Sequence, residues 1–368
     1  MKRNIADLPL HYGNAPTWLF ERQKKLLFEI GKLIITEYGT YEFLSRISDP
    51  VYFQILGCIS GFDWHSSGVT TTTCYALKEA FNEAPEYGIF IFGGKGKRGL
   101  ETPEEIENCK YIENKEKIIL ISKITSKIDN NCIQDGYQIY HHNIFVDING
   151  NWAVIQQGMN KEIRYARRYH WFNKITNSND EKYTIQPHTG IITVKKEEFV
   201  LNLIDKECEK LQNNFIEYLN NSKIEEIRKD IKIIFENSES IFNPEKKLFL
   251  PSHHYVATKF DTKRLYKNFC KLKDKGIKKF NDIVLTEGVG IKTLRALSLI
   301  SEVVYGNTAS FDDPAKFSYA FGGKDGHPYP VDRETYDSVI DFLKGIVEKS
   351  KIKDKEKIEI LRKLSNFL

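Results

Sequence analysis

The sequence predicts an α+β protein: an α-rich N-terminal part with a small antiparallel sheet, followed by an all-α part. Apolar residues recur at helical spacing between residues 16 and 81. Two apolar runs then flank Asn149-Gly150-Asn151, which is a strong signal for a β-hairpin. From Lys196 onward the helical spacing returns. We therefore predict two domains, residues 1–195 and residues 196–368.

The first helix is expected over residues 16–36, because Leu26, Ile30 and Leu33 lie at helical spacing and Gly39 follows the last turn. Thr102-Pro103 indicates another helix start, with a capping residue and a first-turn proline. Further helices are expected over residues 40–47, 49–60, 69–81, 196–220, 223–236, 258–273, 332–348 and 353–366. Strands are expected over residues 87–92, 137–148, 152–157, 183–185 and 191–194.

Composition limits the class of protein. The chain has 368 residues, of which 41% are hydrophobic and 28% charged, as in an ordinary globular protein. The formal net charge of +4 is small, so contact with a polyanion would depend on local patches. No apolar run approaches the roughly 20 residues that span a bilayer, so we expect no membrane partner and a cytoplasmic location. The six widely spaced cysteines are expected to be free thiols.

The most informative segment is residues 278–304, which reads as two helices joined by Gly288-Val289-Gly290. Glycine permits a tight turn, and the second helix then begins with N–H groups that suit a phosphate oxygen. This pattern resembles the helix-hairpin-helix family, which binds the DNA backbone without reading sequence. The resemblance implies an all-α domain containing a helix-hairpin-helix. Its expected DNA contacts are Thr286, Gly288, Gly290, Lys292 and Thr293.

The same segment resembles the helix-hairpin-helix DNA glycosylases, in which a lysine follows the turn by two residues. Lys292 occupies that place, and the resemblance implies an amine nucleophile that attacks the abasic sugar. An activating aspartate follows a Pro-Val step in those enzymes, and Pro330-Val331 precedes Asp332. The spacing from Lys292 to Asp332 is about twice that of the family. The alternative is that Lys292 only contacts phosphate.

A second candidate site is the loop and helix start from Asp63 to Thr73. Ser66 or Ser67 is expected to cap the helix, and four successive threonines are poor helix formers. That pattern favours hydroxyl and N–H groups placed to bind an anion. His65 is a candidate acid–base residue near neutral pH.

The expected strand pair 137–157 carries a candidate metal site. Alternation places His141 and Asp147 on one face and His142 on the other. His141, Asp147 and Gln157 supply nitrogen and oxygen ligands of the kind that Mg²⁺- or Mn²⁺-dependent nucleases use. No other cofactor is expected.

Basic residues interleaved with aromatic ones suggest further DNA contacts. Arg164, Arg167 and Arg168 alternate with tyrosine, histidine and tryptophan, a composition that suits phosphates and unpaired bases. Lys95 and Lys97 lie in a glycine-rich segment that could bind phosphate.

Several strings resemble the prokaryotic family known as domain of unknown function 763. They are His11-Tyr12-Gly13, Asp63-Trp64-His65-Ser66-Ser67-Gly68-Val69, Gly93-Gly94-Lys95-Gly96-Lys97, Gln156-Gln157-Gly158-Met159-Asn160, Arg164-Tyr165-Ala166-Arg167-Arg168-Tyr169-His170-Trp171 and Gly322-Gly323-Lys324-Asp325-Gly326-His327-Pro328. The family brings no assigned activity. From the residues we expect a DNA-binding protein of the repair or recombination type, with glycosylase and abasic-site lyase chemistry at Lys292 and Asp332. The alternatives are a metal-dependent nuclease that uses His65 with the metal site, and a non-catalytic DNA-binding adaptor.

Overall fold

The computed structural model describes residues 17–61, 67–173, 183–193, 196–236, 260–315 and 317–318, and short C-terminal pieces at 341–343, 345–346, 348–349, 357–358 and 360–361. Its helices are α1 (Thr17–Tyr38), α2 (Thr40–Ser48), α3 (Pro50–Ile59), α4 (Gly68–Asn82), α5 (Lys97–Leu100), α6 (Thr102–Asn108), α7 (Lys115–Asn131), α8 (Glu209–Asn221), α9 (Ile224–Ile231), α10 (Thr262–Lys275), α11 (Phe280–Leu285) and α12 (Ile291–Tyr305). Its strands are β1 (Ile89–Lys95), β2 (Ile133–Gln134), β3 (Gln138–Asp147), β4 (Trp152–Asn160), β5 (Tyr165–Phe172), β6 (His188–Thr193), β7 (Leu201–Asn202) and β8 (Phe317–Ser318).

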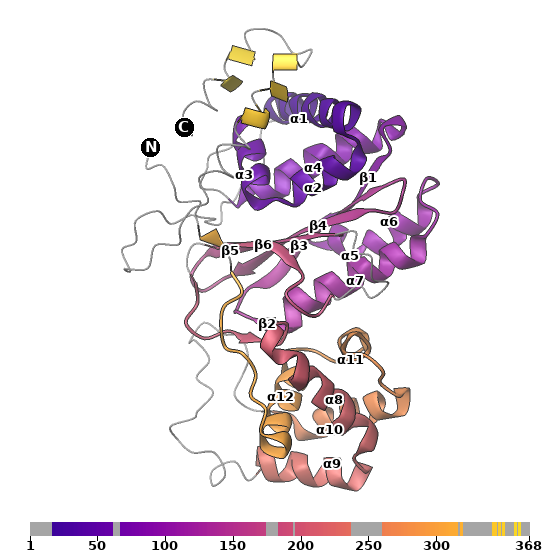
Figure 1. The fold of residues 1–368 in the computed structure, drawn as a ribbon, viewed down its shortest axis with the longest axis vertical. Coiled ribbons are helices and arrows are strands. Elements are labelled where there is room, and N and C mark those ends of the chain that lie inside the picture. Colours follow the sequence, from indigo (N-terminus) through magenta and orange to yellow (C-terminus); the bar gives the residue numbers. More distant parts are fainter. Residues whose placement is uncertain are drawn as a thin grey trace.

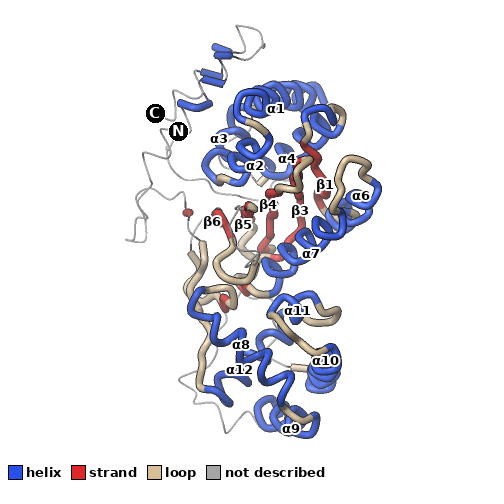
Figure 2. The backbone as a smooth tube through the Cα atoms, turned by 45° about the vertical axis from the view of Figure 1, so that its right-hand side comes forward, coloured by secondary structure: helices blue, strands red, loops and turns tan. Residues whose placement is uncertain are grey.

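The described elements form successive layers (Figure 1). Helices α1 to α4 cover one face of the main sheet, while α6 and α7 cover the other. The helical group α8 to α12 lies beyond α7, and Figure 2 shows α11 next to the end of α7. The predicted class, α+β with an antiparallel sheet, is confirmed. No helix among the described residues is long and apolar enough to cross a bilayer.

The main sheet has the strand order β1-β3-β4-β5-β6-β8. All neighbours are antiparallel except β6 and β8, which run parallel. The hairpin predicted at Asn149-Gly150-Asn151 joins β3 to β4, and Gly150 adopts a φ of 80° there. The strand predicted to stop at residue 92 continues to Lys95, so part of the glycine-rich segment belongs to β1.

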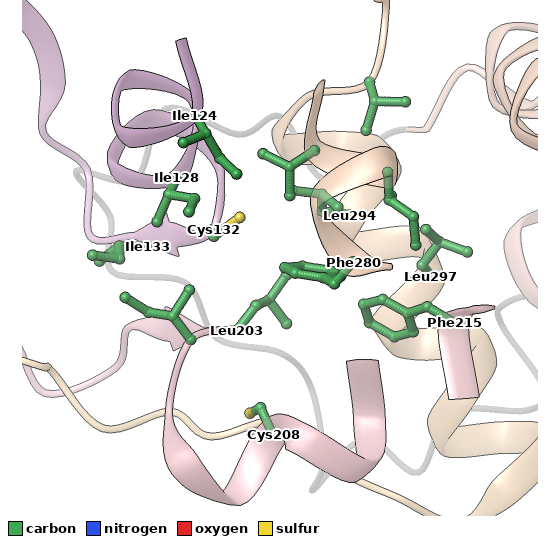
Figure 3. Close-up of a cluster of buried hydrophobic side chains, with 14 of the residues drawn as sticks. Ile124, Ile128, Cys132, Ile133, Leu203, Cys208, Phe215, Phe280, Leu294 and Leu297 are labelled. Atoms are coloured by element: carbon green, nitrogen blue, oxygen red, sulfur yellow. The ribbon is translucent and has the colours of Figure 1, made fainter. Parts of the chain in front are cut away.

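The two faces of the sheet are packed into two hydrophobic clusters. Ile144 and Val146 of β3 belong to one cluster, and Phe145 between them belongs to the other. The first cluster continues through α7 into the helical group, where Ile128, Phe280 and Leu294 lie together (Figure 3). This core therefore contains residues on both sides of position 195. Leu343, Ile346 and Ile360 pack in the second cluster with α1 to α4.

Several local predictions are wrong. No element was expected where the structure has helix α7, or where it has β5, a strand inside the main sheet. The helix predicted from residue 196 begins only at Glu209, because residues 200–204 are buried in an extended segment that pairs with β2 and with Ser310. Residues 183–185 form a turn instead of a strand.

Candidate functional site

The turn between α11 and α12 has the local geometry that its glycines suggested. Gly288 adopts a φ of 86°, a region that side chains disfavour, while Gly290 is extended with a φ of −150°. Val289 between them is buried in the core, and its N–H donates to the carbonyl of Thr286 at 3.2 Å. The turn is thus fixed by a buried side chain as well as by backbone conformation.

Helix α10 supports this turn from the side. The Asn268 amide donates to the Gly288 carbonyl at 3.0 Å and to the Thr293 hydroxyl at 2.9 Å. The Lys275 amine donates to the Thr286 hydroxyl at 3.2 Å. Thr286 and Thr293 are both buried, so their hydroxyls hold the turn instead of facing a ligand. Sequence reasoning missed Asn268, for which no local pattern is diagnostic.

Exposed lysines lie at the turn. Lys271 and Lys275 of α10 bond Glu287 and Thr286, and Lys292 is in the first turn of α12; Lys278 and Lys279 are exposed just before α11. Burial lowers the pKa of Lys127 on α7, and Glu287 and Lys271 also act on that pKa, so α7 borders the turn. Glu287 is the opposing charge: its side chain is 95% exposed and lies 3.2 Å from the Lys271 amine.

The N-terminus of α12 directly follows the turn. Its N-cap is Gly290, which has no side chain to bond the first-turn N–H groups. Lys292 is exposed in this first turn, a position that suits a phosphate contact. It lacks the buried surroundings in which a lysine amine becomes a nucleophile. Asp332 and His65, the other predicted catalytic residues, lie outside the described residues.

A second site lies on the sheet face covered by α4. Lys95, His141, Gln157 and Arg168 are direct neighbours across β1, β3, β4 and β5 and form one row, which we call the polar row. Cross-strand neighbours project to the same face of a sheet. The structure thus joins residues that three separate sequence motifs had singled out.

The polar row is bonded to the first turn of α4. The Gln157 amide donates to the Ser67 carbonyl at 3.0 Å and to the Tyr140 hydroxyl, and its oxygen accepts from the Thr70 hydroxyl. Arg168 donates to Thr70 at 3.2 Å, so both row residues share this hydroxyl. Further guanidinium bonds go to Gln54 and His170, each at 2.8 Å.

His141 differs from its neighbours in the row. It is 2% exposed, and among the described residues neither of its ring nitrogens has a hydrogen-bond partner. Burial lowers its pKa to about 3, and the charges of His142 and Lys95 act in the same direction. The imidazole is therefore neutral at physiological pH, with one donor and one acceptor that no described residue engages.

The predicted metal site is wrong. His141 and Asp147 are six residues apart on one strand, which separates them by roughly 20 Å. Asp147 instead closes the β3–β4 turn, where its carboxylate accepts from the N–H groups of Asn149 and Asn151 at 2.9 Å. Within the described ranges, no group of three or more histidine, cysteine, aspartate or glutamate residues is placed to hold a metal ion.

The predicted arginine surface is also wrong for two of its three members. Arg167 and Arg168 are fully buried on opposite faces of β5. The Arg167 guanidinium bonds Asp135 at 2.8 Å and Asp313 at 2.7 Å, so it is part of a buried ion-pair cluster. Arg164 is exposed in the β4–β5 turn with a φ of 58°. Lys97 is exposed at the start of α5.

Sequence reasoning missed a buried polar network on the opposite sheet face. The Ser122 hydroxyl lies 2.8 Å from His142 Nε2, and His142 Nδ1 lies 3.0 Å from the Gln156 oxygen. The Gln156 amide donates to Asp129 at 2.6 Å, and Asp129 also lies 2.6 Å from His188. Burial raises the pKa of Asp129, while its contacts with His188 oppose that change. The available signal was Asp129 itself, a charge on the apolar side of α7.

Comparison with known families matches residues 4–331 to a family model described as "Protein of unknown function (DUF763)". No curated protein and no solved structure matches the chain.

Proposed function

Because this chain belongs to the DUF763 family, whose description assigns no activity, we propose its function from geometry: sequence-nonspecific binding of the DNA backbone through α11, α12 and the turn between them. The observation that carries the proposal is the N-terminus of α12. It follows the side-chain-free N-cap Gly290 and carries the exposed Lys292 in its first turn.

The physical basis is the affinity of helix N-termini for anions. First-turn N–H groups and the helix dipole both favour a phosphate oxygen at this point. Three backbone and side-chain features hold the turn before any ligand arrives: the conformation of Gly288, buried Val289 and the Asn268 bonds. A site that is already ordered loses less entropy on binding. The contact reads no base edge, so the binding is expected to be independent of sequence.

The biological class we propose is DNA processing of the repair or recombination type, as the helix-hairpin-helix resemblance implies. Lys292 is exposed, which favours a phosphate contact over a Schiff base. Abasic-site lyase activity is therefore tested separately from DNA binding. We do not propose the metal-dependent nuclease, because two of its expected metal ligands, His141 and Asp147, are far apart along β3.

The test is the affinity of the full chain for a labelled DNA duplex, measured by fluorescence anisotropy between about 50 and 200 mM salt. Lys292→Ala is expected to weaken binding equally for all sequences and to reduce the salt slope by about 1. Lys229→Ala is the matched control, because Lys229 is exposed on α9, on the far side of the helical group from α7 (Figure 1). No measurable affinity at low salt would refute the proposal.

The lyase arm uses abasic duplex DNA with borohydride. Covalent trapping by the wild type and its loss in Lys292→Ala would add lyase chemistry to the binding function. Firm binding without trapping would identify a non-catalytic DNA-binding protein.

A further inference from the structure

We propose that the polar row and the first turn of α4 bind a phosphoryl group. The site comprises Lys95, His141, Gln157 and Arg168 of the sheet with Ser67 and Thr70 above them. It lies in the N-terminal part of the chain and is independent of the DNA contact proposed for α11 and α12.

The register of the sheet places the row. Lys95 pairs with His141, His141 with Gln157, and Gln157 with Arg168. Strand β1 is an edge of the sheet, and Lys95 is exposed there, whereas the other three side chains are buried. The row therefore leads from a cation at the solvent edge to a second cation inside the protein.

Helix α4 supplies the electrostatics from above. It has 15 residues, and its N-cap Ser67 makes no side-chain bond to the helix. Its first-turn N–H groups therefore present the positive end of a long helix dipole without a capping oxygen from that residue. Gln157 bonds both Ser67 and Thr70, which fixes this turn directly over the row.

His141 is the independent sign of a missing ligand. It is the cross-strand neighbour of both Lys95 and Gln157, so its ring lies on the same face of the sheet, between these two residues in the row. Both ring nitrogens are buried, and no residue in the described part of the chain bonds them, although buried polar groups are almost always hydrogen-bonded. A phosphoryl oxygen between Lys95 and the α4 turn would accept the hydrogen bond that the imidazole lacks.

The chemistry of the surroundings favours an anion. The row contributes an ammonium and a guanidinium group, and the side chains bonded to it are the amide of Gln54, the hydroxyls of Thr70 and Tyr140, and the imidazole of His170. The Lys95 ammonium would donate a charge-assisted bond, which is the strong kind in proteins, while Arg168, bonded to Gln54, Thr70 and His170, contributes its positive charge. The phosphoryl group could belong to inorganic phosphate or to the 5′ end of a DNA strand.

The experiment titrates the full chain with three probes: inorganic phosphate, a 5′-phosphorylated oligonucleotide and the same oligonucleotide with a 5′-hydroxyl. Affinity is measured by calorimetry, and the ring nitrogens of His141 are followed by ¹⁵N NMR. Binding of a phosphoryl probe should shift the His141 signals. Lys95→Ala should lower the affinity for that probe by about tenfold, the loss expected for one charge-assisted bond. Tighter binding of the phosphorylated oligonucleotide than of inorganic phosphate would identify a DNA end as the source.

Two variants keep the result interpretable. Thr70→Val should weaken phosphate binding similarly, but Thr70 is buried and the variant could fail to fold. Lys95 is exposed, so Lys95→Ala tests the site without disturbing the core. The control is Lys110→Ala, another exposed lysine that lies outside the row. Unchanged His141 signals in the presence of every probe would overturn the proposal, as would equal affinity in wild type and Lys95→Ala. Failure of duplex binding in Lys292→Ala would concern only the α11–α12 site.

Discussion

Gly288 and Gly290 are two residues apart in one turn but experience different constraints. Gly288 has a φ of 86°, and an added Cβ would lie 3.2 Å from the Asn268 oxygen. Gly290 is extended, and its added Cβ would meet nothing closer than 3.8 Å. Gly288→Ala should therefore lower the free energy of unfolding by about 1 kcal/mol or more and weaken duplex binding.

The matched control for that prediction is Gly290→Ala, which should cost less stability than Gly288→Ala, because the extended backbone there suits alanine and only the preference for glycine at the N-cap is lost. Urea unfolding of both variants measures the difference. Equal losses of stability would mean that the positive φ at Gly288 does not determine the turn.

Glu287 is an acidic residue of the turn between α11 and α12. Its exposed carboxylate repels a DNA phosphate and pairs with Lys271 at 3.2 Å. Glu287→Gln should strengthen duplex binding by about two- to fivefold at low salt, with the gain vanishing at high salt as screening increases. Anisotropy at two salt concentrations measures this effect. Glu225→Gln on α9 serves as the control, and a weaker complex with Glu287→Gln would place the DNA elsewhere.

Residue patterns singled out all four members of the polar row but did not predict that they form one row. The β3–β4 turn at Asn149-Gly150 sets the register, and that register alone makes His141 face Gln157. Arg167 and Arg168 were misplaced because an alternating strand sends adjacent residues to opposite faces. Their partners are remote: Asp313 is 146 residues from Arg167 in the sequence. No local pattern identifies such a partner.

At the level of elements, α7 shows why one helix escaped prediction. Its buried face is built from isoleucines at 118, 121, 124 and 128, which fit a helical period but are β-branched and favour strands. The helical spacing of these isoleucines and their propensity for strands therefore predict different structures. Packing of the isoleucine face against the sheet stabilises the helix. The turn between α11 and α12 was predictable because glycine needs no distant partner to form it.

Strand β3 carries two adjacent buried histidines, one on each face. Burial lowers the pKa of His142 to about 4 and that of His141 to about 3. The unfolded chain takes up protons near pH 6.5, whereas the folded protein does so only below these values. Acid therefore favours the unfolded state. Each histidine should cost about 1.4 kcal/mol of stability per pH unit below about 6.5.

The measurement is urea unfolding at pH 7 and pH 5 for the wild type and His142→Asn. Burial raises the pKa of Asp135 to about 6, and its protonation opposes the histidine effect in this range. The difference between the two proteins isolates His142. The wild type should lose more stability than the variant between pH 7 and 5. Equal losses would show that the pKa of His142 is the same in the folded and the unfolded state.

At the scale of the whole molecule, the cores and one ion-pair cluster cross the predicted boundary at residue 195. The first hydrophobic cluster, to which α7 belongs, includes residues from both the sheet and α8 to α12. Arg167 on β5 bonds Asp313, whose carboxylate also accepts from the N–H groups of Glu197 and Ala315. Sequence patterns identify the helices but not this shared interior, because contacts between distant segments leave no periodic trace.

Shared packing implies cooperative unfolding, and Arg167 is the place to test it. Arg167→Met leaves Asp135 and Asp313 buried without their cation, so the free energy of unfolding should fall by about 3–5 kcal/mol. Because the cluster joins the sheet to the C-terminal part, differential scanning calorimetry should show one transition that moves to lower temperature as a whole. The control is Arg164→Ala, because Arg164 is exposed and lies three positions away in the sequence. Its free energy of unfolding should stay within about 0.5 kcal/mol of the wild type. Separate melting of the helical group in Arg167→Met, with the N-terminal transition unmoved, would mean that the two parts fold independently.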